Sequence, residues 1–196
     1  DQGGLIAASH TSSLVGNDAA YGALFDRLGV RRVRSIPELL DTLLVMERLG
    51  PLPGRRIVSL SCSGGEASVV ADSSEALDLE FPDFESDHAS RIADTLTDLV
   101  TVSNPFDYHT FIWGDQDRLT RCFTEVMDGP VDAAVLVLDF PRADLDGSGW
   151  WPTLHAFVDA ARETGTPVVV ASSMAENMPA EAEDAVASAG QVAVRG

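Results

Sequence analysis

The stretch "AAVLVLDF" (residues 133–140) begins with six consecutive apolar residues. A strand that is buried on both faces needs such an unbroken run, whereas a strand with one face in water alternates apolar and polar residues. Residues 55–60 and the run "PVVVASS" (167–173) contain shorter apolar runs rich in Val and Ile, and a helical pattern follows each of them. Buried strands that alternate with helices are typical of a parallel sheet with helices on both faces.

The alternation of strands and helices predicts one domain after the proline-rich segment "PLPG" (51–54). Further strand patterns occur at residues 101–109 and 191–195. Helices are predicted over about residues 65–77, 86–98, 115–128, 151–164 and 180–188. The sequence therefore predicts an α/β fold: an open, flavodoxin-like three-layer domain with a parallel sheet over residues 51–196.

Residues 1–50 have the pattern of the C-terminal part of a second α/β domain. The predicted elements are strands ending at Leu5–Ala8 and over "VRRV" (30–33), and helices over residues 18–28 and from Ser35 to Gly50. Ser35 and Glu38 form a capping box, in which each side chain binds a free backbone N–H group at the start of the second helix.

The composition is strongly acidic, with 13 Lys and Arg residues against 31 Asp and Glu residues and a net charge of −18. Such a chain repels phosphate backbones and anionic lipids, so no nucleic-acid or membrane partner is expected. Cys62 and Cys122 form no zinc or redox motif, which favours a reducing, cytoplasmic location. No metal site is predicted, because Asp144 and Asp146 lack the remainder of a calcium-binding loop.

His10 stands in the polar run "SHTSSLVGN" (9–17). A neutral imidazole is a competent nucleophile near pH 7. The small residues around it leave backbone N–H groups accessible to an anion: Ser9, Thr11, Ser12 and Ser13. This setting suits a histidine that carries a charged group from place to place, and it also fits an ordinary polar surface loop.

The segment "CSGG" (62–65) leads from a predicted strand into a predicted helix. Free N–H groups at a helix start bind anions, so Ser63, Gly64 and Gly65 are candidate phosphate-binding residues. The segment matches neither a Walker A loop nor a G-x-G-x-x-G loop. Ser63 also fits the nucleophile of a serine hydrolase, with Asp139 and His155 as candidate partners.

The loop "SNPFDYHTFIWGD" (103–115) has the densest aromatic content in the chain. Asn104 precedes a proline and favours a turn, and Asp107 can bind a backbone N–H group or a ligand. Asn104, Asp107 and Tyr108 are therefore candidate residues of a pocket or an interface. A lid packed over the end of the sheet fits the same residues.

In this order, the motifs resemble those of the nucleoside-diphosphate-forming acyl-CoA synthetases, relatives of succinyl-CoA synthetase. The family segment S-H-T-G-S-L-A-G-S-D is matched by "SHTSSLVGND" (9–18), the strand ending N-S-G-G by "CSGG" (62–65), and the N-P-x-D turn by "NPFD" (104–107). The resemblance covers nearly the whole chain. Ser12 and Cys62 stand where the family has Gly and Asn.

The resemblance implies that His10 becomes phosphorylated and that helix N-termini, one of them at Ser63–Gly65, hold the phosphoryl group. It implies interconversion of acyl-CoA, phosphate and ADP or GDP with a carboxylic acid, CoA and ATP or GTP. CoA and the nucleotide with Mg²⁺ would be bound mainly by CoA-binding and ATP-grasp domains or subunits of an oligomer, so this segment alone would be inactive. Residues 1–50 would end a succinyl-CoA-ligase-like domain, and residues 51–196 would form a flavodoxin-like CoA-ligase domain.

Two other functions stay open at this point. The replacements at Ser12 and Cys62 suit a non-catalytic relative that serves as a binding or assembly module. The third function is a serine hydrolase that uses Ser63.

Overall fold

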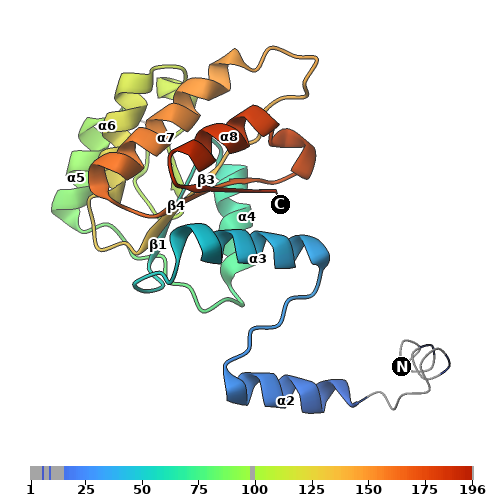
Figure 1. Ribbon diagram of the computed structural model, residues 1–196. Helices are drawn as coiled ribbons and strands as arrows, with labels where there is room; N and C mark the ends of the chain where they lie inside the picture. The colour runs from blue at the N-terminus through green and yellow to red at the C-terminus, as the bar shows by residue number, and fades with distance from the viewer. Residues whose placement is uncertain (1–5, 7–8, 10–15, 98–99, 196) are drawn as a thin grey trace. The chain divides into compact units, whose positions relative to one another are not determined.

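Five parallel strands form the sheet, in the order β2-β1-β3-β4-β5 (Figure 1). This is the strand order of the flavodoxin-like doubly wound fold. The strands are β1 (Ile57–Ser61), β2 (Phe106–Asp107), β3 (Ala133–Val137), β4 (Val168–Ser172) and β5 (Val192–Arg195). The predicted α/β fold is confirmed, and β3, which comes from the apolar run quoted above, is the central strand.

The computed structural model describes residues 6, 9, 16–97 and 100–195. The chain divides into two compact units, residues 1–40 and residues 41–196. This division falls inside helix α3 (Ile36–Leu49), before the boundary that the sequence predicts after residue 50. That boundary between two domains stays a prediction.

In the first unit, helix α2 (Asp18–Leu28) has the predicted bounds. Asn17 begins it, because its side-chain oxygen accepts a hydrogen bond from the N–H of Ala19 at 2.8 Å. Gly29 ends it with a φ of 68°, a conformation that glycine adopts at little cost.

Half of the predicted capping box at the start of α3 is present. Ser35 Oγ accepts a hydrogen bond from the N–H of Glu38 at 3.2 Å. In return, Glu38 Oε2 accepts one from the N–H of Arg34 at 2.6 Å. The bond from Glu38 N–H satisfies a group that the first turn of the helix leaves free, whereas the return bond comes from Arg34 N–H and not from the Ser35 N–H of a capping box.

The strand predicted at residues 30–33 is wrong, because these residues form no strand. An isolated strand leaves its backbone N–H and C=O groups unpaired, and none of the described strands pairs with this segment. Arg32 instead forms an ion pair with Asp18. The strand predicted to end at Leu5–Ala8 lies outside the described residues, apart from Ile6.

The helices of the second unit follow the predicted order. They are α4 (Gly64–Ser74), α5 (Ser86–Asp94), α6 (Gln116–Met127), α7 (Trp151–Thr164) and α8 (Ala180–Ser188), with short 3₁₀ turns η1 (Thr110–Ile112), η2 (Ser148–Trp150) and η3 (Ala175–Asn177). The bounds of α7 and α8 are as predicted, while α4 and α5 end before residues 77 and 98. In residues 101–109, where the sequence predicts a strand that passes into a loop, the strand is limited to β2, since Pro105 has no N–H to donate to a ladder.

The order of the strands decides which face each helix covers. The crossovers from β2 to β3, β3 to β4 and β4 to β5 run in one direction, and the crossover from β1 to β2 runs in the other. Because such crossovers are right-handed, α6, α7 and α8 share one face and α4 lies on the other (Figure 1).

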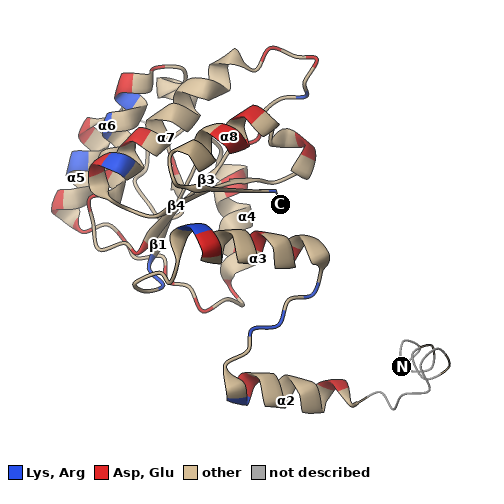
Figure 2. Cartoon of the chain, viewed as in Figure 1, with Lys and Arg blue, Asp and Glu red and all other residues tan. Residues whose placement is uncertain are grey.

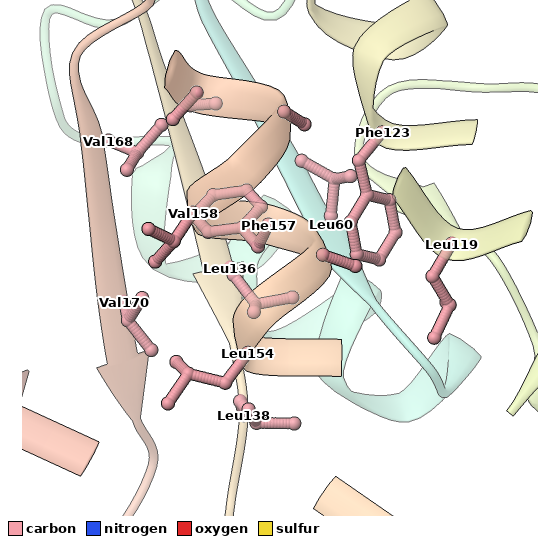
Figure 3. Packing of buried hydrophobic residues seen from close by; sticks show 14 of the residues in the cluster. Leu60, Leu119, Phe123, Leu136, Leu138, Leu154, Phe157, Val158, Val168 and Val170 are labelled. Atoms are coloured by element: carbon pink, nitrogen blue, oxygen red, sulfur yellow. The ribbon is translucent and has the colours of Figure 1, made fainter. Parts of the chain in front are cut away.

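Helix α7 supplies the centre of the core. Figure 3 shows Leu154 and Phe157 of α7 facing Leu136 of β3 and Val170 of β4. Phe157 also packs edge to face on Phe123 of α6, with ring centroids 6.0 Å apart. All five side chains are fully buried, so this face of the sheet forms a continuous apolar core.

The α4 face of the sheet is covered less completely. Val135, Val169 and Ala171 belong to this face because they alternate with the buried Leu136 and Val170, yet each is only half-buried. Helix α4 itself contains no fully buried residue. The protein therefore has one densely packed face and one partly open face.

Asp132 joins the start of β3 to the start of β1. Its carboxylate accepts hydrogen bonds from Arg56 N at 2.9 Å, Nε at 3.0 Å and Nη2 at 2.9 Å. These bonds lower the pKa of Asp132 from its usual value near 3.8 to about 2. They help to fix the strand register, in which Ile57 lies beside Ala133.

The acidic excess is spread over the helices. Figure 2 shows Asp and Glu residues on α3, α4, α6 and α8. Among the helices of the described residues, none has the length and hydrophobicity needed to cross a bilayer.

Replacing Leu136 with Ala should lower the free energy of unfolding by about 2–5 kcal/mol, because the site is enclosed by rigid elements and leaves a cavity. Urea unfolding measures the loss. Leu145→Ala is the matched control, since Leu145 is 60% exposed in a loop, and its effect should stay within about 0.5 kcal/mol. Equal losses in the two variants would contradict this account of the core.

Candidate functional site

The candidate site lies at the carboxyl ends of β1 and β3. The chain leaves β1 toward β2 on one side and returns to β3 on the other, so the two crossovers diverge at this point. Such a switch in strand order opens a crevice, which is where ligands bind in open parallel sheets. Cys62 directly follows β1, and Leu138 and Asp139 directly follow β3.

A pocket of about 620 Å³ occupies this crevice. Its size is within the range of small-molecule sites. One lining residue belongs to β3, one to the first turn of α4, and the others to the segments that follow β1, β2 and β3: Val137; Glu66; Cys62, Thr110, Trp113, Leu138, Asp139 and Trp150.

Ser63 begins helix α4 at the edge of this pocket. Its Oγ accepts a hydrogen bond from the N–H of Glu66 at 3.1 Å, while its backbone carbonyl accepts one from Ser61 Oγ at 3.1 Å. The N–H groups of Gly64 and Gly65 lie in the first turn, where an α-helix provides no internal partner. The start of α4 therefore has backbone donors available for an anion.

The two glycines leave space around these donors. A Cβ atom on Gly65 would have Ser63 Oγ as its nearest neighbour at 3.8 Å, and one on Gly64 would lie 3.4 Å from Asp107 Oδ2. A side chain at Gly65 would occupy space that an anion needs. The carboxylate of Asp107 next to Gly64 opposes a second negative charge here.

Asp107 also shapes the loop that follows β2. Its Oδ1 accepts a hydrogen bond from the N–H of His109 at 2.8 Å. His109 has a φ of 54°, in the left-handed region that non-glycine residues rarely adopt. The resulting turn leads the chain to Thr110 and Trp113, which line the pocket.

Glu66 brings a carboxyl group into the pocket from the first turn of α4. Burial raises the pKa of Glu66, and the charge of Asp139 raises it further. One of its oxygens is buried without a hydrogen-bond partner among the described residues. Burial also raises the pKa of the neighbouring Cys62 thiol to about 11, so this cysteine stays protonated near neutral pH.

Asp139 forms the opposite side of the pocket. Its carboxylate accepts hydrogen bonds from Ser173 N at 2.9 Å and Ser173 Oγ at 2.5 Å, which fix its position. In the same pocket, the rings of Trp113 and Trp150 meet edge to face with centroids 5.3 Å apart. The pocket thus combines aromatic walls with two carboxyl groups.

Two of the candidate residues from the 103–115 loop lie away from the pocket surface. Asn104 Nδ2 donates to the carbonyl of Ile57 at 2.9 Å, and Asn104 Oδ1 accepts from the N–H of Ser59 at 3.2 Å, so its side chain holds the first half of β1. Tyr108 is completely buried in the core beside Phe123. The same loop does supply Thr110 and Trp113 to the pocket.

His10 and the adjacent candidates Thr11, Ser12 and Ser13 lie outside the described residues. Ser9 is described and exposed, and its Oγ donates a hydrogen bond to the carbonyl of Ile6 at 2.8 Å. The predicted phosphoryl-carrying loop therefore stays a prediction.

The hydrolase alternative is wrong, because the structure does not assemble its triad. Ser63 Oγ caps α4, and both oxygens of Asp139 bind Ser173. His155 is exposed on α7 and lies beside Trp151, with ring centroids 5.7 Å apart. No hydrogen bond joins these three described side chains, so His155 and Asp139 do not provide Ser63 with a general base.

Sequence reasoning missed Glu66 and Trp150 as site residues. Glu66 is an ordinary first-turn acid in the sequence, and Trp150 stands in a loop that contains no motif. The available signal for Glu66 was its position three residues after Ser63. For Trp150 it was the position near the end of the loop that follows β3. Only the strand order brings them into one crevice.

The chain is similar to a known family model and to known CoA ligases. Residues 1–46 match the family model described as "Succinyl-CoA ligase like flavodoxin domain". The chain is 29% identical over 101 residues to an ADP-forming acetate–CoA ligase of Methanocaldococcus jannaschii, covering 52% of this chain and 14% of that protein. It is 28% identical over 148 residues to an ADP-forming 4-hydroxybutyrate–CoA ligase of Nitrosopumilus maritimus, covering 74% of this chain and 20% of that protein.

The fold also matches a solved structure. An acetyl-coenzyme A synthetase from Ca. Korarchaeum cryptofilum, solved with phosphate and ADP, superposes with a TM-score of 0.74 at 23% identity. The match covers 98% of this chain and 40% of that chain. This chain thus spans a fifth or less of the length of the two ligases and under half of the solved chain.

The pKa of Glu66 makes stability depend on pH. Because this pKa is raised in the folded state, folding binds a proton, and the free energy of unfolding falls as the pH rises above the group's usual value of 4.5. Glu66→Gln should remove this fall, so the variant should match the wild type near pH 4 and exceed it near pH 7. Urea unfolding at several pH values measures the difference.

Glu75→Gln is the control for this prediction, since Glu75 is exposed at the other end of α4 and carries the same charge. It should follow the wild-type pH dependence. If Glu66→Gln also follows it between pH 4.5 and 7, the buried carboxyl group is not the cause.

Proposed function

This chain is related to the nucleoside-diphosphate-forming acyl-CoA synthetases, and we propose that it is part of such an enzyme, with His10 as the carrier of a phosphoryl group. The proposed reaction interconverts acyl-CoA, phosphate and ADP or GDP with a carboxylic acid, CoA and ATP or GTP. It passes through a phosphohistidine, which the small residues Ser9, Thr11, Ser12 and Ser13 leave room to form.

The observation that carries this proposal is the start of α4. Its free N–H groups at Gly64 and Gly65 lie at the carboxyl end of β1, beside the pocket. The N-terminus of a helix favours an anion by about 0.3–2 kcal/mol through its dipole and its free donors. Ser63, Gly64 and Gly65 would therefore bind the oxygens of the phosphoryl group, while the neutral imidazole of His10 supplies the nucleophile.

Other parts of the enzyme would complete the reaction. CoA and the nucleotide with Mg²⁺ would be held mainly by CoA-binding and ATP-grasp domains or subunits, in an oligomer that acts in the cytoplasm. The described residues of this chain supply one helix-terminus anion site, which is too weak alone to bind these cofactors. We therefore expect no turnover from this chain by itself.

A second candidate is a non-catalytic binding or assembly module of the same fold. The carboxylates of Asp107 and Glu66 favour it, since both lie at the start of α4 and repel a phosphoryl group. The raised pKa of Glu66 reduces this repulsion, because the protonated carboxyl group is neutral and can donate a hydrogen bond. Phosphorylation of the intact enzyme separates the two candidates.

His10→Ala should abolish acid-labile, base-stable phosphate on the complete enzyme after incubation with labelled ATP, or with acyl-CoA and labelled phosphate. The reason is that phosphate on an imidazole nitrogen is lost in acid and kept in base. His155→Ala is the control and should keep the label, because His155 is exposed on α7. Label that survives in His10→Ala would assign the phosphoryl group elsewhere, and no label on the wild type would favour the non-catalytic module.

Gly65→Val should slow phosphorylation of the complete enzyme by about two- to thirtyfold, the range expected from losing a helix-terminus anion contact. The fold should survive, since a Cβ atom at Gly65 meets no atom closer than 3.8 Å. Single-turnover labelling measures the rate. Ala71→Val places the same side chain on an exposed later turn of α4 and should keep the wild-type rate. Equal rates in all three proteins would remove the start of α4 from the reaction.

A further inference from the structure

The pocket beside α4 has an unusual combination of lining residues. Four of its eight lining residues are apolar or aromatic, namely Trp113, Val137, Leu138 and Trp150, and none of the eight is Arg or His. Its ionisable carboxyl groups are those of Glu66 and Asp139. The lining therefore supplies aromatic surface and hydrogen-bond acceptors, but no positive charge.

The two indole rings form adjoining walls. Trp113 and Trp150 lie at 86° to each other with centroids 5.3 Å apart. A Cβ atom on Gly149 would lie 3.1 Å from Trp113 Nε1, so the absence of a side chain there lets the two loops approach closely. Both rings line the pocket, and the face of an indole ring attracts a cation.

The two carboxyl groups need a positive partner. Asp139 is held by Ser173, and Glu66 has an oxygen without a hydrogen-bond partner among the described residues. The charge of Asp139 raises the pKa of Glu66, which means that two negative charges here repel each other. A cationic ligand bound beside both groups would relieve that repulsion.

We propose that the pocket between β1 and β3 binds an organic ammonium group, with Trp113 and Trp150 against the cation and Glu66 and Asp139 as its counter-charges. Cation–π contact and carboxylate pairing act together in such a site. The identity of the ligand rests on the proposed function: the ammonium group would be at one end of the carboxylic acid substrate, and the carboxyl group of that substrate would lie toward the start of α4. The substrate class is then a carboxylic acid that carries an ammonium group.

A bound metal ion fits the same residues less well. Ca²⁺ and Mg²⁺ require six or more oxygen ligands, and indole rings supply none. Apolar walls instead favour a cation that carries carbon substituents, because these remove apolar surface from water. Choline, a trimethylammonium compound, is therefore a suitable probe.

The test is a fluorescence titration of the 196-residue chain, whose three tryptophans include both pocket rings and the adjacent Trp151. Choline should change the emission with saturation and bind about tenfold more tightly than its uncharged carbon isostere, neohexyl alcohol. Magnesium chloride, added at the same ionic strength as the choline salt, should not displace choline from the pocket. Equal affinities for choline and the isostere, or displacement by Mg²⁺, would overturn the proposal.

Three variants locate the binding. Glu66→Gln and Asp139→Asn should each weaken choline about five- to tenfold and leave the isostere unchanged. Trp150→Leu should weaken choline about three- to tenfold through loss of the ring face. Glu75→Gln changes the net charge by the same amount at the far end of α4 and should bind as the wild type does, whereas an equal loss in Glu75→Gln would assign binding to the overall acidity of the chain.

The titration also separates this proposal from the phosphohistidine. It requires neither phosphate nor nucleotide, so a failure to phosphorylate His10 would refute the proposed function and leave ammonium binding measurable. Conversely, a labelled His10 with no preference for choline would keep the proposed function and refute the ammonium site.

Discussion

The parallel pairing of β1 with β2 on one edge and with β3 on the other is the constraint that places the site residues together. It sends the crossovers on either side of β1 to opposite faces of the sheet, so no helix fills the space above the carboxyl end of this strand. Ser63 begins α4 on one side of that space, and Asp139 follows β3 on the other. The bonds from Arg56 to Asp132 at the opposite ends of the two strands hold the register on which this arrangement depends.

Two opposite electrostatic preferences lie next to each other in this crevice. The start of α4 offers backbone donors to an anion, while the pocket beside it is lined by Glu66 and Asp139 and no cationic side chain. A chain with a net charge of −18 repels anions at long range, so short-range donors must provide any affinity for phosphate. A ligand with an anionic end and a cationic end would satisfy both parts of the site at once.

Periodicity was sufficient for the order of the helices, because an amphipathic pattern is decided by neighbouring residues, and the long apolar runs indicated a sheet that is buried on both faces. Helix α7 has the predicted bounds for this reason, and the predicted bond between Ser35 Oγ and the N–H of Glu38 is present. The strand predicted at residues 30–33 failed because a strand exists only where another strand pairs with it. Local sequence patterns could not predict the pocket. Glu66 and Trp150 line it together because of the order of the strands, and no spacing in the chain indicates this.

The register of β1 has a consequence for how the chain folds. Ile57 pairs with Ala133, so the central ladder closes a long loop, whereas β3 and β4 pair Ala134 with Val168 across a single helix. Closing the longer loop costs more chain entropy before any contact compensates for it. The unit of β3, α7 and β4 is therefore expected to form the folding nucleus. Strand β1 is synthesised before this unit, and it cannot pair with β3 until the nucleus exists. The crevice at the carboxyl end of β1 is consequently among the last parts of the molecule to take shape.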